Sequence, residues 1–93
     1  MIRSFRDEEA ESLFRRERSR RLPTDVQRSA QRKLAILHAA NSLDDLRSPP
    51  GNRLEQLSGT RAGQYSIRIN DQWRVCFRWV DGYVDDVEIT DYH

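Results

Sequence analysis

The sequence predicts an α+β domain in which a short N-terminal strand and two helices pack on one face of an antiparallel sheet. The first observation is a change of period. Apolar residues recur three or four positions apart in the first part of the chain, and from residue 54 they alternate with polar residues. The second observation is that Asn70-Asp71 and Asp81-Gly82 separate the alternating segments with residues that favour turns. At 93 residues, the chain is expected to form one domain spanning 1–93.

The elements of the N-terminal half follow from local signals. Residues 2–5, with the sequence IRSF, favour a short strand. Asp7 is a suitable N-cap for the first helix because its carboxylate can accept hydrogen bonds from the unpaired N–H groups of the first turn. The second helix is expected to begin at Pro23 or Thr24, and its apolar face comprises Val26, Ala30, Leu34, Leu37 and Ala40. It must end before Pro49-Pro50-Gly51, which cannot continue a helix.

Composition excludes several classes of protein. No apolar run approaches the roughly 20 residues of a membrane span, and the first residues lack the apolar core of a secretory leader. A soluble, cytoplasmic protein is therefore expected. The single cysteine, Cys76, excludes an internal disulfide and is expected to be a buried strand residue. His38, in the second helix, is expected to be a satisfied or solvent-facing histidine rather than a ligand.

The charges point to a polyanionic or acidic partner. The net charge is only +1, but all of the sixteen Lys and Arg residues except Lys33 are arginine. Arginine presents a planar donor fork that matches phosphate and carboxylate and stacks on bases. Basic residues concentrate in 15–33 and 53–78, whereas residues from 81 onward carry only acidic charges. This pattern indicates binding to nucleic acid or to an acidic protein, with a solvated helix face as the alternative for residues 15–21.

The strand register follows from the apolar faces, because a slip of one residue would reverse every side chain. A three-residue loop, Asn70 to Gln72, pairs Ile67 with Val75 and places Arg68 directly opposite Arg74. The same reasoning for the next hairpin pairs residues Val75 with Ile89, Phe77 with Val87, Arg78 with Asp86 and Arg74 with Thr90. Arg78 thereby gains an acidic partner, whereas Arg68 and Arg74 have none in this register.

Two facing arginines beside a final Asp91-Tyr92-His93 have the composition of a phosphodiester-cleaving site. Cations placed in advance can stabilise a pentavalent phosphate as charge builds on its oxygens. The carboxylate, phenol and imidazole can move protons to and from the attacking and leaving oxygens. No compact set of Asp, Glu and His ligands accompanies them, so a metal is not expected. The alternative is a pair of surface arginines screened by solvent or by nearby acids.

The segment from "RSPPGNRLEQLSGTRAGQYSIRINDQWRVCFRWVDG" to "VEITDYH" resembles the HigB-type toxins, including GraT-like members, of bacterial toxin–antitoxin operons in the RelE/ParE superfamily. The likeness extends to the opening "MIRSF" and to both helices. It implies a twisted antiparallel sheet with two N-terminal helices. It also implies a toxin that enters the ribosomal A site and cuts mRNA without a metal or cofactor, by attack of the RNA 2′-hydroxyl on its own 3′-phosphate.

The resemblance also assigns residues. The catalytic tail of the family falls on Asp91, Tyr92 and His93, its phosphate-contacting strand arginine on Arg74, and its loop arginine on Arg61. The loop "LEQLSG" departs from the family pattern, because Glu55 and Ser58 stand where relatives have a histidine and a lysine. Glu55 is then a candidate base, or a simple ion-pair partner of Arg53 or Arg61. Moderately reduced toxicity is the expected result of this departure.

The predicted catalytic residues are therefore Arg74, Asp91, Tyr92, His93 and Glu55. The predicted phosphate-binding residues are Arg68, Arg61 and Arg53. The partners implied by the resemblance are a helix-turn-helix antitoxin similar to HigA, the ribosome and mRNA, and operator DNA bound through the antitoxin complex, with no membrane. Two other functions stay open. One is non-nuclease inhibition of DNA gyrase, as in the ParE branch. The other is a role mainly as a transcriptional co-regulator bound to the antitoxin.

Overall fold

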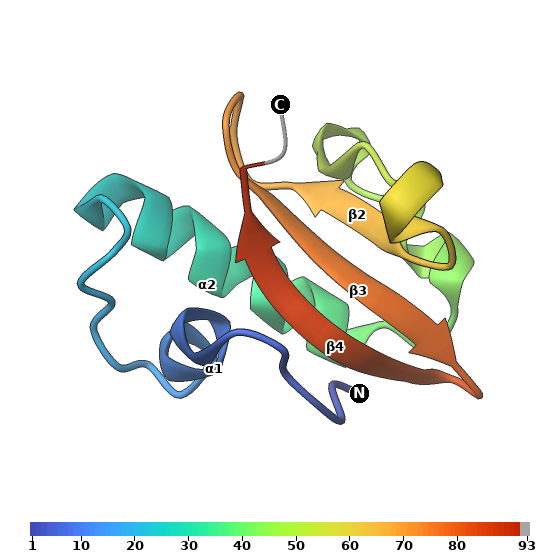
Figure 1. Ribbon diagram of the computed structural model, residues 1–93, viewed down its shortest axis with the longest axis horizontal. Helices are drawn as coiled ribbons and strands as arrows, with labels where there is room; N and C mark the ends of the chain where they lie inside the picture. The colour runs from blue at the N-terminus through green and yellow to red at the C-terminus, as the bar shows by residue number, and fades with distance from the viewer. Residues whose placement is uncertain (92–93) are drawn as a thin grey trace.

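The computed structural model describes residues 1–91, in which two α-helices pack against a four-stranded antiparallel sheet. The helices are α1 (Glu8–Phe14) and α2 (Thr24–Ala39), and the strands are β1 (Glu55–Gln56), β2 (Tyr65–Arg68), β3 (Arg74–Val80) and β4 (Tyr83–Thr90). The strands lie in the order β1-β2-β3-β4. Figure 1 shows α2 behind the sheet and the segment between β1 and β2 in front of it. The predicted fold class is confirmed.

Both helices begin where the sequence predicts. Asp7 caps α1 by accepting a hydrogen bond from the backbone N–H of Glu9 at 3.0 Å. Helix α2 begins at Thr24, directly after Pro23. His38 has a structural role, because its Nδ1 accepts a hydrogen bond from the backbone N–H of Ile2 at 3.1 Å. Helix α2 thereby binds Ile2, which also forms a bridge with Val84 of β4.

The N-terminal strand is shorter than predicted. Ile2 and Phe5 form isolated parallel bridges with Val84 and Val87 of β4 and do not join a continuous ladder. The interruption coincides with Asp86, whose φ is +54° and whose backbone N–H donates to the hydroxyl of Ser4 at 2.9 Å. Asp86 is a bulged residue of β4 and lies outside the regular ladder, so the pairing between residues 2–5 and β4 is interrupted beside it.

The predicted register of β2 and β3 is confirmed. Ile67 pairs with Val75, and Arg68 lies opposite Arg74. The first part of the β3–β4 pairing is also confirmed, with Arg74 opposite Thr90 and Val75 opposite Ile89.

The last part of the predicted β3–β4 register is wrong. The ladder shifts between Cys76 and Arg78, so that Arg78 lies opposite Asp85 and not Asp86. The cause is the extra residue that the β4 bulge introduces, because two residues of the bulged strand then oppose one of its partner. Arg78 nevertheless forms an ion pair with Asp86, with its Nε 3.4 Å from Oδ2.

The core lies between the helices and one face of the sheet. The helices contribute Leu13, Leu34 and Leu37, which are fully buried. The sheet contributes a larger group of buried apolar residues, namely Ile67, Val75, Phe77, Val84, Val87 and Ile89. In the part of the chain that the structure describes, no helix is both long and apolar enough to span a bilayer.

Replacing Phe77 by alanine is expected to lower the free energy of unfolding by about 3–5 kcal/mol. Phe77 is completely buried and is the largest such side chain in the described residues. Its loss removes apolar contact and leaves a cavity between β3 and the helices. Urea denaturation followed by circular dichroism measures the change. Val80→Ala, at an exposed end of the same strand, is the control and should cost less than about 0.5 kcal/mol. Equal effects of the two changes would contradict this description of the core.

Candidate functional site

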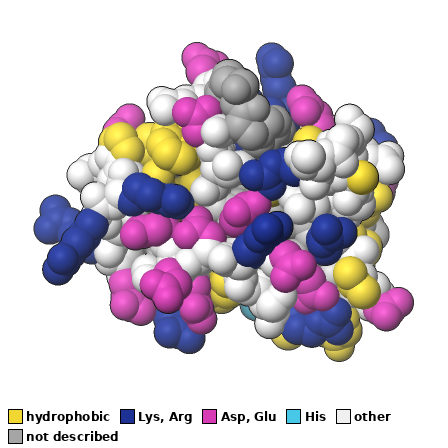
Figure 2. Space-filling view, in the orientation of Figure 1, with side chains coloured by type: hydrophobic (Ala, Val, Ile, Leu, Met, Phe, Trp, Pro, Cys, Tyr) yellow, Lys and Arg dark blue, Asp and Glu magenta, His cyan; other side chains and the backbone are white. Residues whose placement is uncertain are grey.

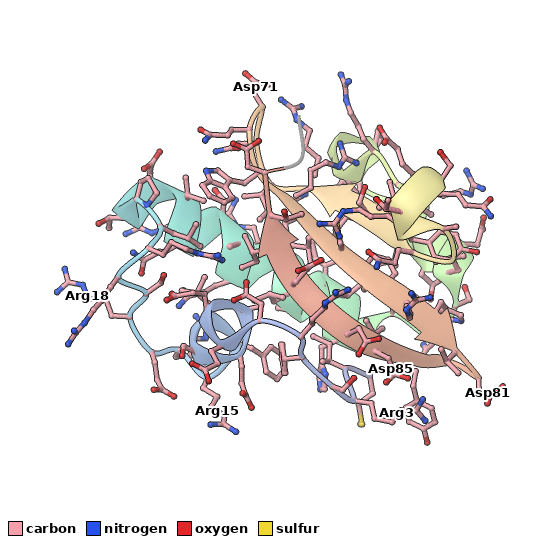
Figure 3. The ribbon with its side chains drawn as sticks, in the orientation of Figure 1. Arg3, Arg15, Arg18, Asp71, Asp81 and Asp85 are labelled. Carbon is pink, nitrogen blue, oxygen red and sulfur yellow. The ribbon has the colours of Figure 1, made fainter. Side chains whose placement is uncertain are left out.

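A cleft of about 330 Å³ opens beside the β2–β3 hairpin. Its lining comprises Arg53, Glu55, Arg68, Asn70, Asp71, Gln72 and Arg74. Because Ile67 and Val75 point into the core, their neighbours Arg68 and Arg74 project from the opposite face of the sheet. The structure therefore brings together four predicted site residues from β1, β2, β3 and the loop before β1. Asp71, at the tip of the hairpin, is labelled in Figure 3.

The guanidinium of Arg74 is held at three of its nitrogen atoms. Its Nε donates to the hydroxyl of Ser66 at 2.9 Å, and its Nη2 donates to the backbone carbonyl of Arg53 at 2.7 Å. Its Nη1 lies 3.7 Å from the Oε1 atom of Glu55. The Arg74 side chain is only 14% exposed, whereas that of Glu55 is 52% exposed. Arg74 is thus a fixed cation at the base of the cleft with an acidic side chain at its solvent side.

Arg68 is arranged in a similar way. Its Nε donates to the backbone carbonyl of Asn70 at 3.1 Å, and its Nη2 forms an ion pair with Asp71. The Asp71 side chain is 97% exposed, against 29% for Arg68. An ion pair with so exposed a carboxylate is screened by water and contributes little to stability. A phosphate group could therefore replace Asp71 at Arg68 at small cost.

The expectation that Arg68 and Arg74 lack acidic partners is wrong. Both partners lie outside the predicted register of β2, β3 and β4: Asp71 in the hairpin loop and Glu55 in β1. Figure 2 views this face of the molecule, where basic and acidic side chains are intermixed. The arginines are therefore partly neutralised in the protein alone, and a polyanion must compete with two carboxylates.

Asp91 lies beside this cleft. Its Oδ2 accepts a hydrogen bond from the Nε2 of Gln72 at 3.0 Å, and Gln72 is one of the lining residues. Thr90 is paired with Arg74, so the end of β4 is brought to the same end of the sheet. The predictions for Tyr92 and His93 lie outside the described residues.

Arg61 is not among the residues that line this cleft. It lines a second hollow of about 250 Å³ with Arg6, Thr60, Gln64 and Glu88. Its Nη1 lies 2.6 Å from the Oε1 of Glu88 and 3.1 Å from the Oε1 of Gln64. The two charged side chains are 27% and 19% exposed. Glu88 thus holds Arg61 over the middle of the sheet, in the second hollow.

Cys76 lies on the cleft side of β3 but is completely buried. The pKa of its thiol is raised to about 11, mainly by burial; the nearby Glu88 also raises it, whereas Arg61 and Arg74 lower it. The nucleophilic thiolate is therefore scarce at neutral pH. The expectation of a buried structural cysteine is confirmed.

The folded protein is accordingly expected to react slowly with Ellman's reagent at pH 8. With a pKa near 11, about one thiol in a thousand is ionised at that pH, and the closed face of the sheet also blocks access. In a denaturant such as guanidinium chloride, one thiol per chain should react rapidly. Rapid and complete reaction of the native protein would show that Cys76 is accessible.

Reasoning from sequence missed three residues that line the cleft, Asn70, Asp71 and Gln72, and also Ser66, the buried residue that bonds Arg74. Ser66 shares the face of Arg68 and Arg74, so alternation along the strand was a usable signal for it. Asn70 and Gln72 enter the site only through the conformation of the hairpin loop. Among residues 1–91, no group of three or more His, Cys, Asp or Glu side chains is arranged to hold a metal ion.

The fold places the chain in one structural class with YoeB and YafQ. It resembles the toxin–antitoxin complex YoeB–YefM from Staphylococcus aureus with a TM-score of 0.61 and 16% identity, over 100% of this chain and 98% of that chain. It resembles a mutant of YafQ from E. coli with a TM-score of 0.64 and 11% identity, over 98% of this chain and 93% of that chain. At these identities, the similarity defines the fold alone.

The sequence narrows this class to one family. Residues 3–93 match the family model of the HigB-like toxins. This family is described as the RelE-like toxins of the type II toxin–antitoxin system HigB. Toxin HigB-1 from Vibrio cholerae is 45% identical over 83 residues, or 88% of this chain and 87% of that protein. Endoribonuclease HigB from Proteus vulgaris is 31% identical over 94 residues and the full length of both chains. The chain belongs to the HigB-like toxin family, and the predicted resemblance is confirmed.

Proposed function

We propose that this toxin is an endoribonuclease that cuts mRNA on the translating ribosome. The observation that carries the proposal is the cleft in which Arg68 and Arg74 face each other beside Glu55, with Asp91 at its rim. The name of the Proteus vulgaris relative, Endoribonuclease HigB, supports the same activity. Two cations on facing strands suit a phosphodiester, which carries its charge on two non-bridging oxygens.

The proposed reaction needs only groups of the protein and the RNA. The 2′-hydroxyl gives its proton to a base and attacks the adjacent phosphorus. The bond from phosphorus to the 5′-oxygen breaks, and that oxygen takes a proton, which leaves a 2′,3′-cyclic phosphate and a 5′-hydroxyl. Arg74 stabilises the charge that builds on the phosphate oxygens, while Arg68 and Arg53 bind the neighbouring backbone. Proton transfer is assigned to Glu55, Asp91, Tyr92 and His93 as a group.

Arg61 has a different place in this proposal. Its ion pair with Glu88 lies outside the cleft, so a contact with the reacting phosphate requires Arg61 to exchange that partner for RNA. We therefore assign Arg61 to RNA binding along the face of the sheet and not to the chemical step.

The decisive experiment induces the toxin from a tightly controlled promoter and maps the 5′ ends of cellular mRNAs. Cuts within codons that disappear when initiation of translation is blocked are the expected result. Cuts that persist without translation would contradict the dependence on ribosomes. DNA breaks and an SOS response with intact mRNA would instead identify a gyrase inhibitor and overturn the proposal.

The partners follow from membership of a toxin–antitoxin family, which implies an antitoxin protein. We propose that it is a helix-turn-helix protein similar to HigA and that the complex binds operator DNA. The ribosomal A site and mRNA are the proposed targets, which places the toxin in the cytoplasm. The adjacent reading frame should encode the antitoxin. Its co-expression should restore growth, and the purified complex should retard a DNA fragment carrying the promoter.

A further inference from the structure

The position of Arg74 depends on two acceptors that are themselves fixed. One is the hydroxyl of Ser66, which accepts from Nε at 2.9 Å, and the other is the carbonyl of Arg53, which accepts from Nη2 at 2.7 Å. A guanidinium has five N–H donors in a rigid plane. Two bonds from different nitrogen atoms of that plane therefore restrict both its position and its orientation.

Ser66 is fixed by the sheet around it. It is fully buried and is paired on both sides, with Glu55 of β1 and with Cys76 of β3. Its backbone cannot move without breaking the ladder on two strands. The hydroxyl is consequently a stationary acceptor beneath Arg74.

The carbonyl of Arg53 is fixed by the turn that precedes β1. Arg53 adopts a left-handed conformation, with φ 45° and ψ 58°, which is unfavourable for a residue with a side chain. The preceding residue, Asn52, is fully buried, and its side-chain amide donates to the carbonyls of Leu46 and Ser48 at 3.2 Å each. Strained backbone of this kind persists where the surroundings determine it. Asn52 supplies that constraint.

These bonds leave three N–H groups of Arg74 outside the hydrogen bonds of residues 1–91: one on Nη2 and two on Nη1, the atom nearest Glu55. Nη1 is the nitrogen on the side of Glu55, and both Glu55 and Arg74 line the cleft. We propose that Ser66 is a positioning residue for the proposed RNA cleavage: its hydroxyl holds Nε so that the remaining N–H groups of Arg74 meet the reacting phosphate. This inference rests on the proposed function, because it assigns Ser66 a part in the same reaction.

The proposal predicts a specific kinetic defect in Ser66→Ala. Single-turnover cleavage is measured on purified ribosomes carrying a defined mRNA, over a range of toxin concentrations. The rate at saturation should fall about 10- to 100-fold, because small displacements of a catalytic group have effects of this order. The toxin concentration at half-saturation should change less than about threefold, since Arg68 and Arg53 still bind RNA. Ser66→Thr, which keeps the hydroxyl, should restore most of the rate.

A measurement without RNA reports the position of Arg74 itself. In an ¹⁵N-labelled sample, the side-chain Nε–H signal of Arg74 is identified by its absence from Arg74→Lys. It should exchange slowly with water in the wild-type protein and in Ser66→Thr, and rapidly in Ser66→Ala. Ser19→Ala is the matched control, because it removes another nearly buried hydroxyl, bonded to Glu9. It should leave both the Arg74 signal and the cleavage rate unchanged. The dispersion of backbone amide signals verifies that each variant is folded.

Three outcomes would overturn the proposal. An unchanged Arg74 signal in Ser66→Ala would show that the hydroxyl does not hold the guanidinium. A changed signal with an unchanged cleavage rate would show that the orientation does not matter for the reaction. Equal losses of rate in Ser66→Ala and Ser66→Thr would attribute the effect to packing. Absence of cleavage by the wild-type toxin is a separate result, which contradicts the proposed function, while the Arg74 signal still decides whether Ser66 holds the side chain.

Discussion

Replacing Arg74 by alanine should slow mRNA cleavage about 10²- to 10³-fold, the effect typical of removing a donor placed in advance for developing charge. Arg74 is the least exposed cation of the cleft and is already oriented by Ser66 and Arg53. It therefore need not reorganise when RNA binds. Induction of the variant should no longer arrest growth, and single-turnover cleavage on programmed ribosomes measures the loss.

Arg78→Ala is the matched control for this experiment. Arg78 projects from the same strand and the same face as Arg74, but its ion pair is with Asp86, at the bulge in β4. It does not line the cleft. Cleavage by Arg78→Ala should stay within about threefold of wild type. A growth arrest that survives Arg74→Ala would remove this residue from the catalytic assignment.

Deleting residues 91–93 should abolish toxicity while leaving the fold intact. The deletion removes three proposed proton-transfer groups at once, and each such group typically contributes 10²-fold or more to a rate. The core is made by residues that precede Thr90, and Asp91 is exposed. The free energy of unfolding should therefore change by less than about 1 kcal/mol. Growth after induction and urea denaturation measure the two effects.

The control for the deletion is Asp81→Asn, which changes an acidic residue at the tip of the other hairpin, at the opposite end of the sheet (Figure 3). Asp81 has a φ of +52°, a conformation that asparagine also tolerates, so the fold should be preserved. This variant should remain fully toxic. A truncated protein that still arrests growth would show that Asp91, Tyr92 and His93 are dispensable.

Much of the fold could be predicted because the signals were local or periodic. The apolar stripe of α2 and the N-cap of Asp7 concern residues within a few turns of each other. The register of β2 and β3 followed from the requirement that Ile67 and Val75 share a face. The bulge at Asp86 could not be predicted in this way, because it is associated with a hydrogen bond to Ser4, which is 82 residues away in the sequence.

The candidate site was predictable only where it is built from strand positions. The register placed Arg68 opposite Arg74 and brought Thr90 beside them. It could not supply the acidic partners Asp71 and Glu55, which reach the arginines from a hairpin loop and from a two-residue strand. The register also could not show that Arg61 does not line the cleft. Its place depends on where the segment after β1 positions Arg61 relative to Glu88.

The contact between the start of the chain and β4 has a consequence for self-association. β4 is an edge strand of the sheet, and exposed edges can recruit strands from other molecules. Here the backbone N–H and carbonyl groups of Val84 bond to Met1 and Arg3, and those of Val87 bond to Ser4 and Arg6. The two acidic residues between them, together with the bulge, disfavour any incoming strand. The other edge, β1, has two residues. Neither edge is a good template for aggregation, so the toxin should remain soluble at concentrations at which a bare four-stranded sheet would assemble into fibres.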